Sequence, residues 1–319
     1  MKAALYKEYG SADVVSAMNV VKPKPGDNDV LIKVKYTAVT AADARIRGAI
    51  FPKGFGFLAR LAFGIGKPRN QILGSCFSGV IEAVGKDVDV FKSGDEVCGM
   101  SGIKMGAHAE YIVVNARKSL AIKPQNVTHK DAAGMLFGGT AALYFLRDQA
   151  RVKQGESVLV NGASGAVGTN AVQIARHLGA SVTGVTSGDS ADLVKLLGAE
   201  NIIDYTKESI FDSEKEYDVV LDAVGNINIK AGKEILTKQG RLVLMVASLG
   251  EILRSQSDGR VKTGTATEKK EDIEFLLQLM ERGELKTVID SEYLFDDIVE
   301  AHKRVSGGDK KGNVMVRVA

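Results

Sequence analysis

The sequence predicts an α/β protein in which a domain of short, mainly antiparallel strands is followed by a doubly wound parallel sheet. Up to about Lys123, short apolar strands alternate with turns, at the spacing typical of an antiparallel barrel. After Pro124, strands alternate with helices, and runs such as VVL and LVLMV are continuously apolar, as in a parallel sheet covered on both faces. At 319 residues the chain is long enough for two such domains.

The first part is predicted to hold strands interrupted by one aromatic-rich loop. After an initial alternating strand, MKAALY, strands are expected at 30–36, 79–84, 96–98 and 111–114. The stretch 49–70 gathers phenylalanines among glycines, although only 6% of the chain is aromatic. Two interpretations stay open: a loop that caps the barrel, or an apolar wall or lid over a substrate, formed by Phe51, Phe55 and Phe57.

The second part reads as strands and helices in turn. A helix over 129–148 is predicted to break at 138–140, and a helix at 271–280, another at about 295–305 and a strand at 313–318 close the chain. Between them, strands are expected at 157–160, 181–185, 201–203, 218–222 and 241–246. Further helices are expected at 190–197 and 229–236.

The segment 157–185 carries the strongest functional signal. An apolar strand meets a glycine-dense turn, which opens into a helix that Gly179 ends before a second strand. Strand, tight turn, helix and strand in about 30 residues form the unit that binds dinucleotides, and this context disfavours an ordinary turn without a ligand. Gly165 would let backbone approach a pyrophosphate, and Gly168 would let the helix lie close to the sheet. The predicted cofactor contacts of this turn are Ala163, Ser164, Gly165, Ala166, Val167 and Gly168.

Composition favours a small-molecule partner. The net charge of +3 comes from 42 basic and 39 acidic residues without long blocks of either sign, which argues against a nucleic-acid or membrane partner. Two cysteines, Cys76 and Cys98, and a start without a basic-then-apolar leader predict a cytoplasmic protein. The most apolar stretch, 132–146, is shorter than the roughly 20 residues of a spanning helix.

Several motifs together resemble the medium-chain dehydrogenases/reductases, and specifically their zinc-free quinone oxidoreductase-like branch. They are GDEV at 94–97, GAHAEY at 106–111, AAGMLFGGTA at 132–141, the glycine turn, LGAENIIDY at 197–205, DAVG at 222–225 and LKTVID at 285–290. The resemblance covers nearly the whole chain. It implies a GroES-like catalytic domain formed by 1–123 and 267–319, with a Rossmann domain, 124–266, inserted between.

The resemblance also suggests how the reaction site is furnished. Where zinc-using relatives carry ligands, this chain has Thr40 and Ser75, and Cys76, Cys98, His108 and Asp43 are too scattered to suggest a tetrahedral zinc site. Thr40 and Thr140 are the family-position candidates for hydrogen bonding to a substrate oxygen. Asp43 is a candidate for proton relay, or caps a short helix instead. Thr40 and Cys76 stand where the branch usually has asparagine and an acidic residue.

The expected cofactor is NADPH, with NADH less favoured. An NAD site places a carboxylate at the end of the second strand, and here that strand ends in Thr186 and Ser187. Hydroxyl groups can donate to a 2′-phosphate, which a carboxylate would repel, although a polar turn without that role stays possible. The resemblance adds further cofactor contacts at Tyr205, Val224, Gly225, Ala247 and Asn313.

The sequence therefore predicts a zinc-independent reductase that moves hydride from NADPH to a quinone, an enone or another reactive carbonyl. Two alternatives stay open: an NAD(P)-dependent alcohol or carbonyl dehydrogenase of the same fold, and an NADPH-binding sensor or partner-binding protein with little turnover. The late runs 240–247 and 259–266 could form the edge of the parallel sheet, where relatives pair across a two-fold axis. A homodimer is expected on that ground.

Overall fold

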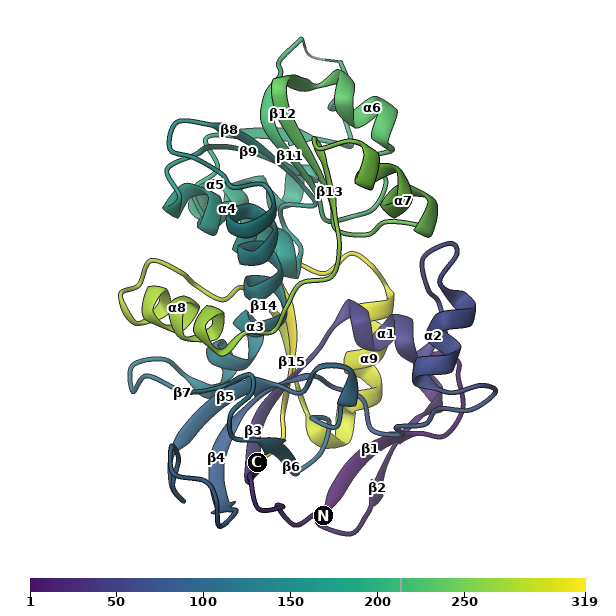
Figure 1. The fold of residues 1–319 in the computed structure, drawn as a ribbon, viewed down its shortest axis with the longest axis vertical. Coiled ribbons are helices and arrows are strands. Elements are labelled where there is room, and N and C mark those ends of the chain that lie inside the picture. Colours follow the sequence, from purple (N-terminus) through teal and green to yellow (C-terminus); the bar gives the residue numbers. More distant parts are fainter. Residues whose placement is uncertain (213) are drawn as a thin grey trace. The chain divides into compact units, whose positions relative to one another are not determined.

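The computed structural model describes residues 1–212 and 214–319, and these divide into two compact units (Figure 1). Unit 1 comprises Met1–Phe51, Gly56–Phe137 and Glu268–Ala319, and unit 2 comprises Pro52–Phe55 and Gly138–Thr267. The sequence analysis places the first domain boundary after residue 123, whereas the units divide between Phe137 and Gly138, inside helix α3 (His129–Leu143).

Unit 2 is built on a parallel sheet. Its strands lie in the order β10 (Asn201–Asp204), β9 (Ser181–Thr186), β8 (Ser157–Asn161), β11 (Tyr217–Asp222), β12 (Leu236–Leu244) and β13 (Val261–Thr263). The first strand of the unit, β8, is central, and the strand order reverses between β8 and β11. In such sheets ligands bind at this reversal, beyond the carboxyl ends of the strands. Of the two runs expected at the edge, β13 lies there and β12 is an inner strand.

The helices of unit 2 follow its strands. They are α4 (Ala166–His177), α5 (Ala191–Leu196), α6 (Ile229–Glu234) and α7 (Leu249–Ser257). The predicted break at 138–140 is wrong, because α3 continues through it to Leu143 and a π-helical segment (Tyr144–Gln149) follows. Glycine is needed at position 138 for packing, because a Cβ there would lie 2.1 Å from the Ala166 carbonyl oxygen. This glycine lets two helices approach closely instead of ending one.

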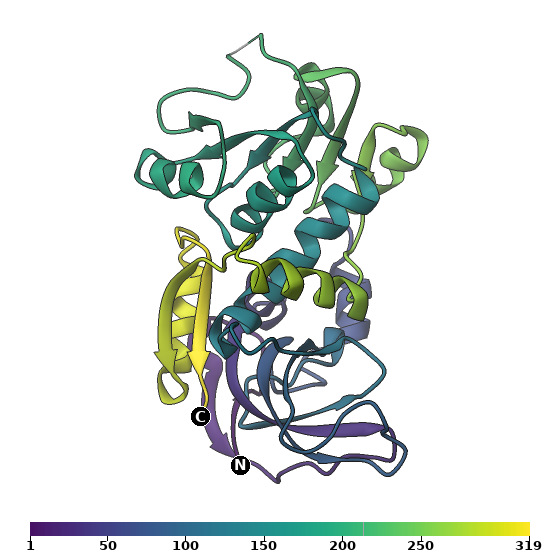
Figure 2. The same cartoon turned by 90° about the vertical axis from the view of Figure 1, so that its left-hand side faces the viewer.

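Unit 1 is built on a mixed sheet to which both ends of the chain contribute (Figure 2). β15 (Asn313–Arg317) pairs parallel with β14 (Ile289–Leu294) and antiparallel with β3 (Asp29–Val39). The sheet continues through β4 (Cys76–Val84), β5 (Glu96–Met100) and β7 (Leu120–Ile122), while β6 (Tyr111–Asn115) pairs with β3, and β1 (Lys2–Tyr6) pairs with β2 (Val15–Asn19). Two apolar clusters fill this unit, one between the first strands and α9 (Ile298–Ser306), the other inside the antiparallel strands.

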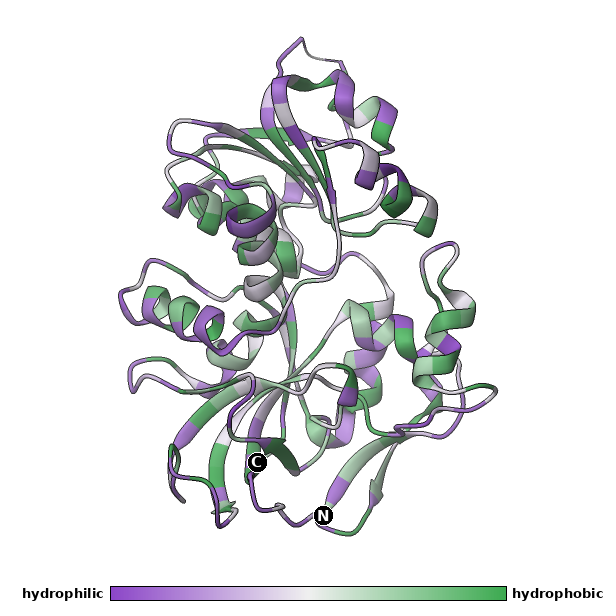
Figure 3. Ribbon diagram, in the orientation of Figure 1, coloured by the Kyte–Doolittle hydropathy of each residue, from purple (hydrophilic) through white to green (hydrophobic). Residues whose placement is uncertain are grey.

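Three further helices belong to unit 1: α1 (Ala41–Arg47), α2 (Gly56–Phe63) and α8 (Lys270–Glu281). The sequence analysis treats 49–70 as a loop and so misses α2. Figure 3 shows α2 as a largely apolar helix, and none of its residues is buried. In the described part of the chain, none of the helices combines the length and the apolar character needed to cross a membrane.

Candidate cofactor and reaction site

The glycine turn between β8 and α4 is shaped for an anionic ligand. Gly165 is the N-cap of α4 and supplies no side-chain cap, so the N–H groups of the first helical turn stay available to a ligand. A Cβ at Gly165 would meet only the Gly162 carbonyl oxygen, at an ordinary 3.4 Å. A Cβ at Gly168 would lie 2.0 Å from the same oxygen. The fold therefore requires glycine at 168, whereas at 165 it leaves open space beside the helix start.

A second turn lies against the first. A Cβ on Gly162 would come within 2.7 Å of Val224, which is 50% exposed and follows β11. The buried Asp222 carboxylate fixes this turn: Oδ1 accepts from the backbone N–H of Val224 at 3.0 Å and of Gly225 at 2.9 Å, and Oδ2 accepts from that of Ile227 at 2.9 Å. Asp222 thereby positions two predicted cofactor contacts, a role that its apolar-strand context did not indicate.

The end of β9 leaves a hydroxyl group unused. The Thr186 side chain is 1% exposed, and its Oγ1 has no hydrogen-bond partner among the residues that the structure describes. A buried hydroxyl without a partner costs about 1–3 kcal/mol, so a ligand that accepts its hydrogen bond would recover that free energy. The backbone N–H of Tyr205 donates to the Thr186 carbonyl oxygen at 3.2 Å, and Ser187 is half-buried beside it. These predicted cofactor residues lie together.

A cation that the sequence analysis missed lies at the same strand end. A Cβ on Gly188 would lie 2.7 Å from Asp204 Oδ2 and 3.9 Å from Lys207 Nζ. Lys207 is largely exposed and pairs with Asp204 at 3.3 Å. Hydrogen bonds from Thr206 and Lys207 hold the pKa of the Asp204 carboxyl below its usual value, although partial desolvation opposes them. The motif LGAENIIDY ends at Tyr205, two residues before this lysine.

In unit 1, Thr40 and Asp43 form a closed pair. Thr40 caps α1, its Oγ1 donates to Asp43 Oδ2 at 2.6 Å, and its backbone N–H donates to the same oxygen at 2.8 Å. Asp43 is fully buried, and its Oδ1 accepts from the Gly74 backbone N–H at 2.8 Å. A threonine has one O–H to donate. While Thr40 donates to Asp43, it has no proton left for a substrate oxygen.

Two buried histidines lie behind this pair. The Arg47 guanidinium donates to His302 Nδ1 at 2.8 Å, so His302 is neutral with its proton on Nε2. His108 Nε2 donates to the Ala38 carbonyl oxygen at 3.2 Å, and the two imidazole rings meet edge to face at 5.2 Å. Burial lowers the pKa of His108, and burial with the neighbouring His108 and Arg47 lowers that of His302 further. Both rings act as neutral packing groups.

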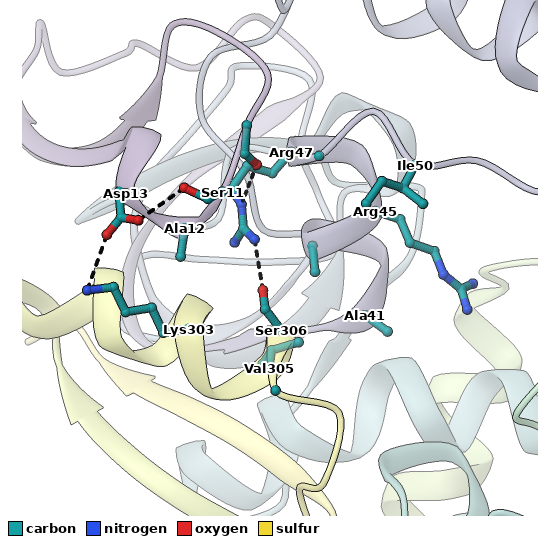
Figure 4. A pocket seen from close by; sticks show the side chains of 14 residues that line it. Ser11, Ala12, Asp13, Ala41, Arg45, Arg47, Ile50, Lys303, Val305 and Ser306 are labelled. Carbon is teal, nitrogen blue, oxygen red and sulfur yellow. Dashed lines mark hydrogen bonds and ion pairs between the residues drawn. The ribbon is translucent and has the colours of Figure 1, made fainter.

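A groove of about 790 Å³ opens on the outer side of the same elements (Figure 4). Its walls come from residues 10–13, from α1 and from the end of α9. Figure 4 shows the Arg47 guanidinium hydrogen-bonded to Ser306, where Nη2 donates to Oγ at 2.9 Å, and Nε donates to the Gly10 carbonyl oxygen at 3.4 Å. Arg47 thus links the groove wall to the buried histidines.

The remaining predicted residues belong partly to unit 1 and partly to unit 2. Thr140 is a buried residue of α3 in unit 2, and Ala247 is buried in the core of the same unit. Asn313 begins β15 in unit 1, where its amide donates to the Val288 carbonyl oxygen at 3.0 Å. The three phenylalanines of the predicted pocket differ: Phe51 stacks on Phe63 at 5.9 Å, Phe55 is half-buried in unit 2, and Phe57 is 73% exposed.

The cysteines are separate. Cys76 and Cys98 lie on β4 and β5, both fully buried and unpaired, and burial raises the pKa of Cys98 to about 12. Within residues 1–212 and 214–319, no three His, Cys, Asp or Glu side chains gather closely enough to hold a metal ion.

The chain matches two families by sequence. Residues 26–125 match the alcohol dehydrogenase GroES-like domain, and residues 197–316 match the family described as zinc-binding dehydrogenase.

Individual relatives align over nearly the whole chain. An NADPH-dependent alkenal/one oxidoreductase of Arabidopsis thaliana chloroplasts is 32% identical, over 99% of this chain and 79% of the relative. The quinone oxidoreductase of Homo sapiens is 30% identical, over 99% of this chain and 97% of the relative. Among solved structures, the quinone oxidoreductase from Coxiella burnetii superposes with a TM-score of 0.90 at 27% identity, covering 100% of this chain and 99% of its own.

Proposed function

Since the chain belongs to the quinone oxidoreductase group of the medium-chain dehydrogenases/reductases, we propose that it transfers hydride from NADPH to a quinone, an enone or another reactive carbonyl. The observation that carries the proposal is the combination of an uncapped helix start at Gly165 with the buried, unpartnered Thr186 hydroxyl at the next strand end. The described residues of unit 2 provide neither a side-chain cap for this helix start nor a partner for this hydroxyl.

The residues of unit 2 fit a phosphorylated dinucleotide. The N–H groups of Ala166, Val167 and Gly168 would face its pyrophosphate. The hydrogen bonds that the Asp222 carboxylate accepts would hold Val224 and Gly225 against it. Thr186, Ser187, Tyr205 and Lys207 would meet the adenosine end. Hydroxyl and ammonium groups donate to a 2′-phosphate, so this set favours NADPH over NADH, while the paired Asp204 reduces the advantage.

When bound, the nicotinamide supplies the hydride, and the chain supplies binding and orientation. Negative charge that develops on a substrate oxygen needs hydrogen-bond donors. Because Thr40 donates to Asp43, we assign Thr40 and Asp43 to holding α1 in place. Thr140 is the remaining family-position candidate for the donor.

Three further properties belong to the proposal. The enzyme works without zinc, because Thr40 and Ser75 replace metal-binding side chains. It is a homodimer that continues its parallel sheet through the β13 edge. It acts in the cytoplasm on small-molecule substrates.

Titration of the purified protein with NADPH and NADH, followed by fluorescence, tests the cofactor assignment. We expect NADPH to bind at least about tenfold more tightly, a difference of roughly 1.4 kcal/mol. Equal affinities would contradict it. Activity should survive dialysis against a chelator, and one zinc per active chain would contradict the zinc-free assignment.

A further inference from the structure

Helix α2 and the turn after it expose an apolar face. Phe57 is 73% exposed, Leu58 55%, Leu61 44% and Ile65 70%. The three helical positions are spaced one, three and four residues apart, so their side chains share one side of the helix. Large apolar side chains gathered on one exposed element indicate an interaction surface. We call these four residues the apolar face.

The opposite side of α2 is anchored to unit 1. Phe63 stacks on Phe51 with the ring planes 7° from parallel, and both pack against the core that includes Tyr6 and Leu73. The Tyr9 hydroxyl donates to the Gly64 carbonyl oxygen at 2.8 Å. These contacts fix which side of α2 points outward, so the apolar face cannot turn into its own core.

Cations that form no ion pair with the described residues lie close to this face in the sequence. Between Asp43 and Glu82 the sequence contains no carboxylate, although it contains arginines and lysines. Arg60, Lys67 and Arg69 are exposed, and none pairs with a carboxylate of the described residues. Arg69 donates to the Leu61 carbonyl oxygen at 3.3 Å, which places its charge beside α2. The whole-chain charge argued against a membrane partner, but this local distribution does not.

We propose that the apolar face, with Arg60, Lys67 and Arg69, docks on the surface of a bilayer that contains anionic lipid. An amphipathic helix with aromatic and leucine side chains on one face and cations beside it lies in the headgroup region of such a surface. The cations complement the lipid phosphates, and the absence of carboxylates over 38 residues, 44–81, removes the opposing repulsion. A soluble acidic protein would satisfy the cations but would not require four exposed apolar side chains.

Docking would bring the enzyme to lipophilic acceptors. A quinone with an apolar tail is dissolved in the bilayer, so a surface-bound reductase meets it at a far higher local concentration. This consequence rests on the proposed function, whereas the docking itself does not.

Co-sedimentation with vesicles tests the docking without cofactor or substrate. We expect binding to phosphatidylcholine vesicles with about one third phosphatidylglycerol at low salt, and release at about 0.5 M salt. The Arg60→Gln/Lys67→Gln variant should bind about thirtyfold more weakly, because each surface cation contributes about 1 kcal/mol. The Leu58→Gln/Leu61→Gln variant should bind at least about tenfold more weakly, since glutamine keeps the helix but not the apolar face.

The matched control is Leu196→Gln/Lys238→Gln, which removes an 82% exposed leucine and an exposed lysine of unit 2 and should bind like the wild type. Failure to bind anionic vesicles, or equal binding by wild type and the Leu58→Gln/Leu61→Gln variant, would overturn the proposal. Two effects of the Leu58→Gln/Leu61→Gln variant in the absence of vesicles would also overturn the proposal. A higher KM for a water-soluble quinone would show that the apolar face is part of a lid over the substrate. A change from dimer to monomer would show that it is an interface with a second copy of the chain.

Discussion

The two units treat their polar groups in opposite ways. In unit 2, the helix start at Gly165 has no side-chain cap, and the Thr186 hydroxyl has no hydrogen-bond partner among the described residues. In unit 1, the Thr40 hydroxyl and both Asp43 oxygens are already used in hydrogen bonds within the unit. A group that the fold leaves unpaired is available to a ligand, whereas a paired one stabilises the fold. The unpaired groups of unit 2 therefore indicate where a cofactor would bind, whereas the paired groups of unit 1 do not indicate which residues act on the substrate.

Two glycines of one turn test whether the helix start of unit 2 binds the cofactor. Gly165→Val places a branched side chain where the pyrophosphate would lie, yet its Cβ has room in the fold. We expect NADPH binding to weaken at least about a hundredfold with an unchanged melting temperature. Gly168→Val should instead destabilise or abolish folding, because its Cβ would lie 2.0 Å from a backbone oxygen. Normal affinity in Gly165→Val would mean that the turn is only structural.

The two threonines should also separate stability from catalysis. Thr40→Val removes the N-cap of α1 and should lower the free energy of unfolding by about 1–2 kcal/mol while changing kcat little. Thr140→Val should lower kcat at least about tenfold, since it removes the proposed donor to the substrate oxygen. Urea unfolding and steady-state kinetics measure both variants, with Thr40→Ser as the control that retains the cap. The reverse pattern would make Thr40 the donor.

Lys207 should sharpen the cofactor preference. Lys207→Gln removes a cation from the β9 end and leaves Asp204 without its ion pair. We expect the Kd for NADPH to rise about five- to tenfold and the Kd for NADH to stay unchanged. The exposed lysine Lys238, changed to glutamine, serves as the control. Equal losses for both cofactors would show that Lys207 does not discriminate at the 2′ position.

The buried histidines should make stability depend on pH. His108 and His302 have folded-state pKa values below the unfolded value near 6.5, so the unfolded chain binds more protons below that pH. The free energy of unfolding should therefore fall as pH drops from about 6.5 to 5, by up to about 1.4 kcal/mol per pH unit for each histidine. His302→Gln should reduce this slope by up to about 1.4 kcal/mol per pH unit, the contribution of one proton. An unchanged slope would mean that His302 is protonated in the fold.

Sequence reasoning reached the parts of the molecule that depend on backbone pattern. The alternation of strands and helices predicted the parallel sheet. The glycine spacing predicted the turn, because at position 168 only glycine permits the close backbone approach. The helix break at 138–140 was predicted wrongly, since the same property of glycine also serves close helix packing. Asp222 and Lys207 were missed as site residues because their roles depend on turns formed by distant strands. All the site residues, with Asp222 and Lys207 among them, stay predictions.

The most direct test of the central claim is steady-state oxidation of NADPH with a panel of quinones and enones, using chelator-treated protein. We expect sustained turnover with at least one acceptor class, with kcat/KM for NADPH at least about tenfold above that for NADH. Tight NADPH binding without turnover of any acceptor would contradict it and identify a cofactor-binding sensor instead.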